Sequence, residues 1–179
     1  MTANSDVPAL TDLDFLPYLD ADGQLPAELS GKIGAYAIFD RDRVLQFVGY
    51  SRDVFLSLKQ HLARRPQQCY WVKAHAIARP SRQILDGART AWLTENKTSP
   101  PGNGEEFELW TQAIDAKLHL SDEEREQLQR GDELTRMKLL KNAARRVEAE
   151  VKSALDARGA RLEMRFNPKL KEQGLLDLK

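Results

Sequence analysis

Two side chains in the first half of the sequence, Tyr36 and His61, are candidates for chemistry because each can both donate and accept a hydrogen bond. Tyr36 closes the tripeptide Gly34-Ala35-Tyr36, and a second tripeptide, Phe47-Val48-Gly49, begins eleven positions after Tyr36. Structural roles stay open beside the functional ones. Tyr36 could be a strand residue with a satisfied hydroxyl, and His61 could cap the end of a helix.

The composition restricts the classes of protein to which the chain can belong. Its 179 residues are 41% hydrophobic and 30% charged, which is typical of an ordinary globular protein. The 27 Lys and Arg residues balance 27 Asp and Glu residues, so the basic surplus usual in DNA-binding proteins is missing, although a local basic patch stays open. The single cysteine, Cys69, can form neither an internal disulfide nor a thiolate zinc site.

The first residues of the sequence contain acidic side chains and lack a long apolar run. We therefore expect neither a signal peptide nor a membrane span, and we predict a cytoplasmic location.

A strand hairpin is the element expected to position Tyr36. Residues 32–39 and 43–49 are rich in β-forming side chains, and the polar turn 40–42 separates them. Alternation along the first strand places Gly34, Tyr36 and Ile38 on one face. The opposite face receives Ile33, Ala35, Ala37 and Phe39.

A helix is the element expected to position His61. Apolar side chains recur at helical spacing after residue 51, Ser51 or Asp53 can cap the start, and Pro66 follows the end. A third strand is predicted over 69–77 and a second helix over 81–95. The stretch 96–104 consists of loop-forming residues.

The remainder of the chain is expected to be mainly helical. Helices are predicted over 105–118 and 133–157, and Ser121 with Glu124 forms a capping-box pattern between them. Residues 161–166 alternate apolar and polar side chains, which predicts a late strand with one solvated face. The tail 169–179 could dock on the body of the protein or bind a partner.

The order strand, strand, helix, strand, helix, with Gly34-Ala35-Tyr36 and Phe47-Val48-Gly49 on the first two strands, resembles the GIY-YIG nuclease domain. The resemblance covers about residues 32–96, roughly a third of the chain. The Pro-Pro-Gly-Asn loop that begins at residue 100 and the final stretch KEQGLLDLK also resemble a subgroup of GIY-YIG-domain proteins found in cyanobacteria and plastids.

The resemblance assigns catalytic positions to Tyr36 and His61, and both are retained. In the family, the tyrosines and a histidine help to activate the nucleophile, a helix arginine stabilises the phosphate, and a glutamate holds a divalent metal. Phe47 stands at the second tyrosine and lacks its hydroxyl, while Ser57 stands at the arginine and carries no charge. Arg89 stands where the glutamate is expected, three residues before the tryptophan of the second helix.

Two other residues could replace the missing groups. Arg52 could reach a phosphate from the start of the first helix, and Asp86 is the nearest carboxylate if the second helix is shifted by one turn. With these substitutes the resemblance implies a Mg²⁺ or Mn²⁺ cofactor, and without them it implies none. We count Tyr50 with Phe47, Arg52, Ser57 and Arg89 as candidate binding residues.

The expected fold is α+β, with a small antiparallel sheet flanked by helices, a helical C-terminal extension and a late strand. We expect an N-terminal arm over 1–30, a GIY-YIG-like core over 31–104, and an extension over 105–179 packed on that core. The function expected first is a non-cleaving module that binds a protein or nucleic acid. The alternatives are a metal-dependent endonuclease in DNA repair or recombination, and a scaffold or assembly factor for a photosynthetic or plastid-type complex.

Overall fold

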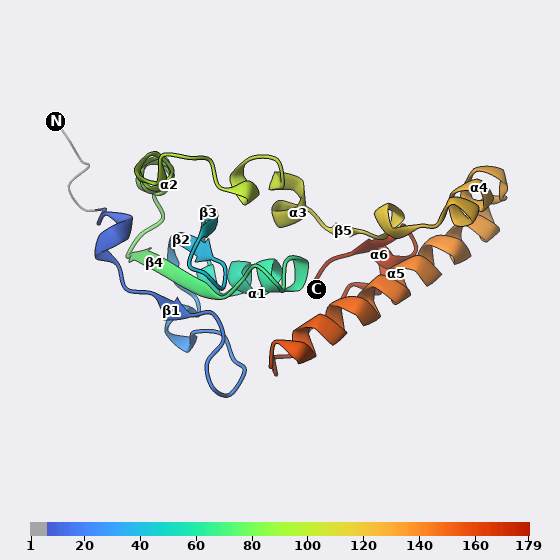
Figure 1. Cartoon of the computed structure of the whole chain (residues 1–179), viewed down its shortest axis with the longest axis horizontal. Helices are drawn as coiled ribbons and strands as arrows, with labels where there is room; N and C mark the ends of the chain where they lie inside the picture. The colour runs from blue at the N-terminus through green and yellow to red at the C-terminus, as the bar shows by residue number, and fades with distance from the viewer. Residues whose placement is uncertain (1–6) are drawn as a thin grey trace.

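The computed structural model describes residues 7–179 and has an α+β fold built on a four-stranded antiparallel sheet (Figure 1). The strand order is β1-β4-β2-β3, so β2 lies inside the sheet and β3 lies at an edge. The strands are β1 (Leu16–Pro17), β2 (Ile33–Phe39), β3 (Leu45–Ser51) and β4 (Trp71–Ile77). The predicted fold class is confirmed.

The β2–β3 hairpin sets the register of the two tripeptides. Tyr36 pairs with Gly49 and Ile38 pairs with Phe47. The connecting turn is longer than predicted because the Asp40 carboxylate accepts hydrogen bonds from the backbone amides of Asp42 and Val44. The second strand therefore begins at Leu45 rather than at residue 43.

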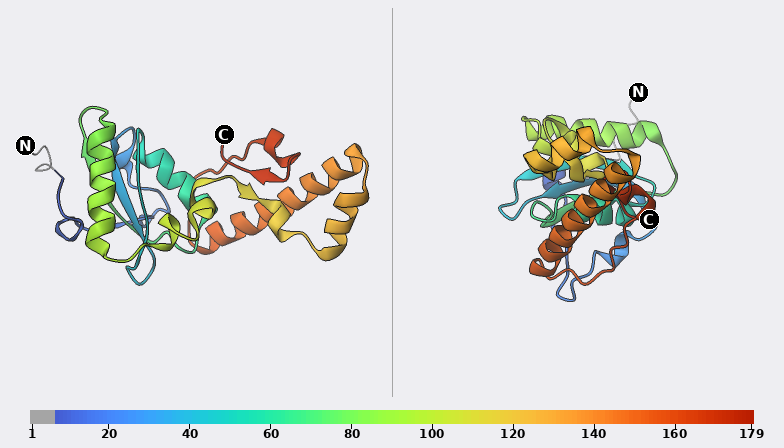
Figure 2. Two further views of the ribbon diagram at one scale, coloured as in Figure 1. Left: turned by 90° about the horizontal axis from the view of Figure 1, so that it is seen from above. Right: turned by 90° about the vertical axis from the view of Figure 1, so that its right-hand side faces the viewer.

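One helix covers each face of the sheet (Figure 2, left). Helix α1 (Val54–Arg64) begins after Asp53, whose side chain accepts a hydrogen bond from the amide of Leu56, and it packs on the face that carries Tyr36. Helix α2 (Arg82–Asn96) is capped by Ser81 and packs on the opposite face through Leu85, Ala88 and Trp92. Both faces of the sheet are thus buried.

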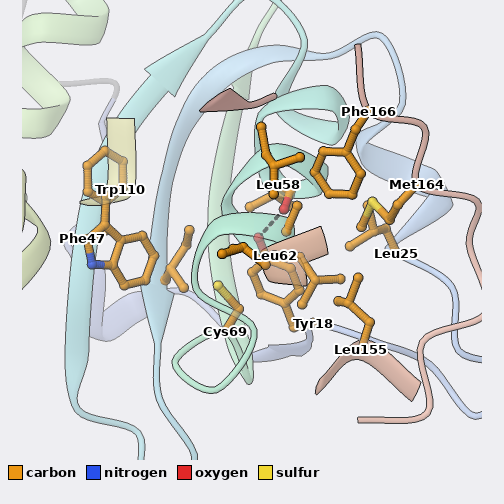
Figure 3. Close-up of a cluster of buried hydrophobic side chains, with 14 of the residues drawn as sticks. Tyr18, Leu25, Phe47, Leu58, Leu62, Cys69, Trp110, Leu155, Met164 and Phe166 are labelled. Atoms are coloured by element: carbon orange, nitrogen blue, oxygen red, sulfur yellow. Dashed lines mark hydrogen bonds between the residues drawn. The ribbon is translucent and has the colours of Figure 1, made fainter. Parts of the chain in front are cut away.

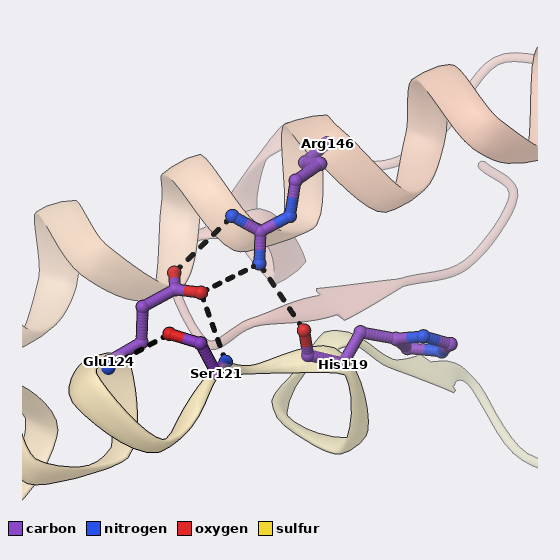
Figure 4. A network of polar contacts seen from close by, with 4 residues as sticks. All are labelled: His119, Ser121, Glu124 and Arg146. Carbon is purple, nitrogen blue, oxygen red and sulfur yellow. Dashed lines mark hydrogen bonds and ion pairs between the residues drawn. The ribbon is translucent and has the colours of Figure 1, made fainter.

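A helical hairpin of α4 (Asp122–Arg130) and α5 (Glu133–Ala157) extends away from the sheet (Figure 2, left). The capping box of Ser121 and Glu124 is confirmed. Arg146 of α5 fastens the two helices, since its guanidinium donates to Glu124 Oε1 at 3.1 Å and to the His119 carbonyl at 3.4 Å (Figure 4).

The predicted helix over 105–118 is wrong in its second half. The segment folds as 3-10 helix Pro101–Asn103, helix α3 (Phe107–Thr111), strand β5 (Ile114–Asp115) and 3-10 helix Ala116–His119. Ile114 leaves the helical pattern because it pairs with Leu176 of strand β6 (Leu175–Leu176). A small late sheet of β5 and β6 results.

The strand predicted over 161–166 is also wrong. Met164 and Phe166 are buried and alternate with exposed residues, as the pattern indicated, but the only bridge that the segment makes within residues 7–179 joins Phe166 to Leu178. Alternating burial here reflects side chains that pack on the core without a neighbouring strand. The tail, including helix α6 (Pro168–Lys171), docks on the body through the pairing of β6 with β5.

The main core joins the sheet to the C-terminal extension (Figure 3). Leu58 and Leu62 of α1 pack in the same cluster as Trp110, Leu155 and Phe166 from later parts of the chain. Trp92 and Trp110 are fully buried, whereas Trp71 is only partly buried. Among residues 7–179, the helices are all too short or too polar to cross a bilayer.

Candidate functional site

Tyr36 and His61 form a buried hydrogen-bonded pair. Tyr36 comes from the middle of β2, His61 comes from the last turns of α1, and Tyr36 Oη lies 2.8 Å from His61 Nε2. Burial, and then the nearby Arg64 guanidinium, lower the pKa of His61 to about 3. Burial also raises the pKa of the Tyr36 hydroxyl well above its usual range. At neutral pH the hydroxyl therefore keeps its proton and donates a hydrogen bond to Nε2 of the neutral imidazole.

Phe47 packs between this pair and the C-terminal extension. Its ring stacks on Trp110 (Figure 3), with a centroid distance of 5.5 Å and an interplanar angle of 3°. The centroid of the Phe47 ring also lies 4.6 Å from that of the His61 ring. Trp110 belongs to α3, so the extension closes one side of the site. The sequence analysis treated Phe47 only as a tyrosine position without a hydroxyl and did not predict that it stacks on Trp110.

Gly49 lets Tyr36 reach its position. A β-carbon at Gly49 would lie 2.6 Å from Phe47 Cε1 and 3.0 Å from Tyr36 Oη. Both distances are shorter than carbon contacts normally allow, so any side chain at residue 49 would displace one of the two rings. Close packing of the Phe47 and Tyr36 rings therefore requires a glycine at residue 49.

The loop after α2 covers the exposed edge of β3. The side-chain carbonyl of Asn103 accepts a hydrogen bond from the Val48 amide at 2.7 Å, and its NH₂ group donates to the Val48 carbonyl at 2.8 Å. A β-carbon on the adjacent Gly102 would lie 2.6 Å from the Gln46 carbonyl. The sequence predicted a loop here but not that its Asn and Gly replace a neighbouring strand.

A cavity of about 260 Å³ opens beside the Tyr36–His61 pair. It brings together the sequence candidates Tyr36, Phe47, Tyr50, Ser57, His61 and Arg89. The other lining residues are Val48, Gly49, Gln60, Arg64, Asn103, Phe107 and Thr111.

Arg52 and Asp86 lie outside the lining of this cavity. Arg52 is exposed at the start of α1. Asp86 Oδ1 accepts a hydrogen bond at 2.8 Å from Arg89 Nη2. The Ser57 hydroxyl donates to Ser51 Oγ at 2.7 Å.

Arg64 is a lining residue that the sequence analysis did not single out. Its side chain is 8% exposed, Nη1 donates to the Trp110 carbonyl at 3.1 Å, and Nη2 pairs with Asp177 Oδ1 at 3.1 Å. Arg64 lies three residues after His61, and this spacing puts both side chains on one face of a helix. That spacing was the signal that could have identified it.

The lining residues do not suit a divalent metal ion. They include the guanidinium groups of Arg64 and Arg89 and contain no carboxylate. Within the part of the chain that the structure describes, no three His, Cys, Asp or Glu side chains are grouped so that they could hold a metal. Mg²⁺ and Mn²⁺ prefer oxygen ligands, above all carboxylates, and the cavity provides only neutral ones.

Comparison with known proteins identifies a homologue of this chain. No protein-family profile matches the chain. Bifunctional monothiol glutaredoxin-S16, chloroplastic, from Arabidopsis thaliana is 35% identical over 103 residues, which are 55% of this chain and 33% of that protein. The N-terminal part of that protein is a GIY-YIG domain, so the homology confirms the GIY-YIG resemblance. The aligned region spans only about a third of the relative's length.

Proposed function

We propose that this chain is a GIY-YIG-like module that binds or assembles with a partner and does not cleave nucleic acid. The observation that carries the proposal is the cavity itself. It retains the Tyr36–His61 pair, but Arg89 lines it where the resemblance expects a metal-binding glutamate. Phe47 and Ser57, which replace two further catalytic groups, line the same cavity.

The physical reason is that hydrolysis of a phosphodiester needs several groups together. A water molecule must be activated, the charge on the phosphate must be stabilised, and the family uses a metal ion for the chemistry. The Arg89 guanidinium would repel a divalent cation at the expected metal position. The Tyr36 hydroxyl, with its raised pKa, is poorly suited to take a proton from water near neutral pH.

The alternative function is a metal-dependent endonuclease in DNA repair or recombination, with Arg52 and Asp86 as substitutes. Two observations argue against it. Arg52 is exposed and outside the cavity lining. Asp86 is engaged by Arg89 at 2.8 Å and faces Arg82 at 3.7 Å, so its charge is already balanced.

The partner can be a nucleic acid or a protein, and the relative suggests one protein to test. Its name describes a bifunctional monothiol glutaredoxin, so a GIY-YIG domain and a glutaredoxin share one chain there. A glutaredoxin supplied as a separate chain is therefore a candidate partner. Cys69, the single cysteine, is buried and its pKa is raised to about 12, so binding rather than thiol exchange is proposed.

The name of the relative is also relevant to the cellular location of this chain and to the hypothesis that it is a scaffold or assembly factor. It is named as chloroplastic, which agrees with the resemblance to a plastid subgroup and leaves room for an assembly role in a plastid-type complex. The cytoplasmic location stays a prediction.

The test is a combined cleavage and binding assay on labelled branched and linear DNA, with Mg²⁺ or Mn²⁺, at low and moderate salt. We expect no cleavage. Salt-sensitive binding would identify nucleic acid as the partner. Absence of binding would direct the search to proteins, beginning with a pull-down against a monothiol glutaredoxin. Metal-dependent cleavage that a Tyr36→Phe variant abolishes would overturn the proposal.

A further inference from the structure

The chemistry of the cavity points to an anionic ligand. Two guanidinium groups line it, together with the His61 imidazole, the hydroxyls of Tyr36, Tyr50, Ser57 and Thr111 and the amides of Gln60 and Asn103. The side chains of Tyr36, His61, Ser57, Thr111 and Asn103 already bond within the protein, which leaves the Tyr50 hydroxyl and the Gln60 amide as the neutral groups available to a ligand. Carboxylates are absent from the lining. Such a mixture of cations and neutral hydrogen-bond donors suits an oxyanion.

Arg89 is held in place at the cavity by two contacts. Its Cζ lies 5.1 Å from the centroid of the Tyr50 ring, and Nη2 donates to Asp86 Oδ1. The Arg89 side chain is still 42% exposed, so part of the guanidinium remains accessible. A planar guanidinium carries five N–H donors, and these two contacts leave several of them free to bind a ligand.

Arg64 is the second cation, and it is far more buried. Its Nη atoms donate to the Trp110 carbonyl and to Asp177, while Nε is buried and has no hydrogen-bond partner among the described residues. Its charge acts on the cavity, because it helps to lower the pKa of His61 and partly offsets the rise that burial causes in the pKa of Tyr36. His61 Nδ1 is buried as well and faces the backbone of Trp110.

The size of the cavity restricts the ligand. A volume of about 260 Å³ lies below the usual range for drug-sized ligands, and Phe107 and Thr111 of α3 stand among its lining residues. A phosphoryl group with its oxygens fits both this size and the donor set.

We propose that the cavity binds a terminal phosphoryl group directly through Arg89 and Arg64, without a bridging metal ion. This inference rests on the proposed non-cleaving function and specifies its ligand chemistry. The source of the phosphoryl group can be inorganic phosphate, a nucleoside monophosphate or the phosphorylated end of an oligonucleotide. The guanidinium of Arg89 takes the position that the family gives to the metal ligand.

The experiment titrates the full chain with inorganic phosphate, with a nucleoside 5′-monophosphate, and with a short single strand bearing either a 5′-phosphate or a 5′-hydroxyl. Every titration contains EDTA, and binding is followed by NMR shifts of the Arg89 and Arg64 side chains. We expect saturable binding for phosphorylated ligands and none for the 5′-hydroxyl strand. The tightest ligand identifies the source.

Two variants make the test specific. Arg89→Gln should weaken phosphate binding by roughly tenfold or more, because a charge-assisted hydrogen bond is lost. Arg82→Gln is the matched control, since Arg82 lies on the same helix, faces the same Asp86, is 88% exposed and does not line the cavity. It should bind phosphate as the unmodified chain does, and thermal melting should show that both variants are folded.

Three results would overturn the inference: no saturable phosphate binding, equal losses in the two variants, or binding that appears only after Mg²⁺ is added. These failures are distinct from failure of the proposed function. DNA cleavage in the presence of metal would overturn the proposed function even if phosphate binds in EDTA. Partner binding without cleavage and without phosphate binding would overturn this inference alone.

Discussion

His61 shows at the residue scale how burial changes the chemistry of a side chain. In solution its imidazole would be half protonated near pH 6.5, but in the fold it stays neutral down to about pH 3. It can therefore accept the Tyr36 hydrogen bond throughout the physiological pH range. Because burial keeps His61 neutral, the stability of the fold depends on pH and decreases at acidic pH.

The first prediction follows from this shift. Between pH 6.5 and 3 the unfolded chain binds a proton at His61 that the folded chain does not bind. The contribution of His61 to the free energy of unfolding therefore has its full value above pH 6.5 and decreases as the pH is lowered towards 3. The fall is at most about 1.4 kcal/mol per pH unit. Urea unfolding at pH 7 and pH 5 should show it, and His61→Gln should remove most of this slope. His119→Gln, at an exposed position, should retain the slope; equal slopes in all three proteins would contradict the pKa assigned to His61.

A second residue-scale prediction concerns Gly49. Substitution by alanine should destabilise the fold by about 1–3 kcal/mol, because the added carbon meets the rings of Phe47 and Tyr36. Gly87→Ala is the control, since nothing lies within 4 Å of a β-carbon at that helical position. It should be neutral or stabilising by up to about 1 kcal/mol. Thermal unfolding of both variants measures the difference, and a harmless Gly49→Ala would mean that the hairpin packs less tightly than described.

Asn103 links two elements, the edge strand β3 and the loop that covers it. Asn103→Ala should cost about 1–3 kcal/mol because the NH and the carbonyl of Val48 both lose their partner. Hydrogen exchange of the Val48 amide should accelerate at the same time. Asn142→Ala, at an exposed site on α5, should change stability by no more than about 0.5 kcal/mol. Unchanged protection of Val48 would show that the loop does not act as a substitute strand.

The elements differ in how well the sequence predicted them, and the reason is the range of the contacts that decide them. Helix α5 has the predicted bounds 133–157, because a long apolar stripe and the Asp132 cap are local signals. Ile114 was placed in a helix because its partner, Leu176, lies 62 positions away and leaves no local trace. The segment 161–166 shows the converse, a local alternation without a strand to pair with.

The same distinction applies to the site. Tyr36 and His61 could be recognised from motif and spacing, and the structure brings them together. Arg64 could have been found from its spacing to His61, whereas Trp110 and Asn103 reach the site through long-range contacts of the C-terminal extension and the loop, which no short sequence pattern indicates. Asp86 and Arg52 were reasonable substitutes by charge, but both lie outside the lining: Arg52 is exposed just before α1, and Asp86 bonds to Arg89, which lines the cavity in its place.

At the scale of the whole molecule, the C-terminal tail is tied to the site through Arg64. The Arg64–Asp177 pair joins residues 113 positions apart and fixes the guanidinium that lines the cavity. Asp177→Ala should lower the free energy of unfolding by about 1–3 kcal/mol, because it leaves a largely buried cation with one remaining acceptor. Glu163→Ala removes a partner from an exposed ion pair with Arg165 and should be nearly neutral. Equal stabilities of the two variants would mean that the tail contributes no stabilising contact at this point.

The arrangement of the whole chain also bears on access. The extension contributes Trp110, Phe107 and Thr111 to the site, so the GIY-YIG-like sheet and the later helices build one cavity together. Access to the cavity therefore depends on how α3 is positioned by the extension.

The most direct measurement of the central claim is a single-turnover cleavage assay with the protein in large excess over labelled branched DNA. Mn²⁺, Mg²⁺ and EDTA reactions are followed over hours, with an active nuclease as the positive control. We predict that the unmodified chain leaves the DNA intact in all three, as does Tyr36→Phe. Metal-dependent cutting by the unmodified chain, lost in Tyr36→Phe and absent in EDTA, would show that the cavity is an active site and would contradict the non-cleaving function.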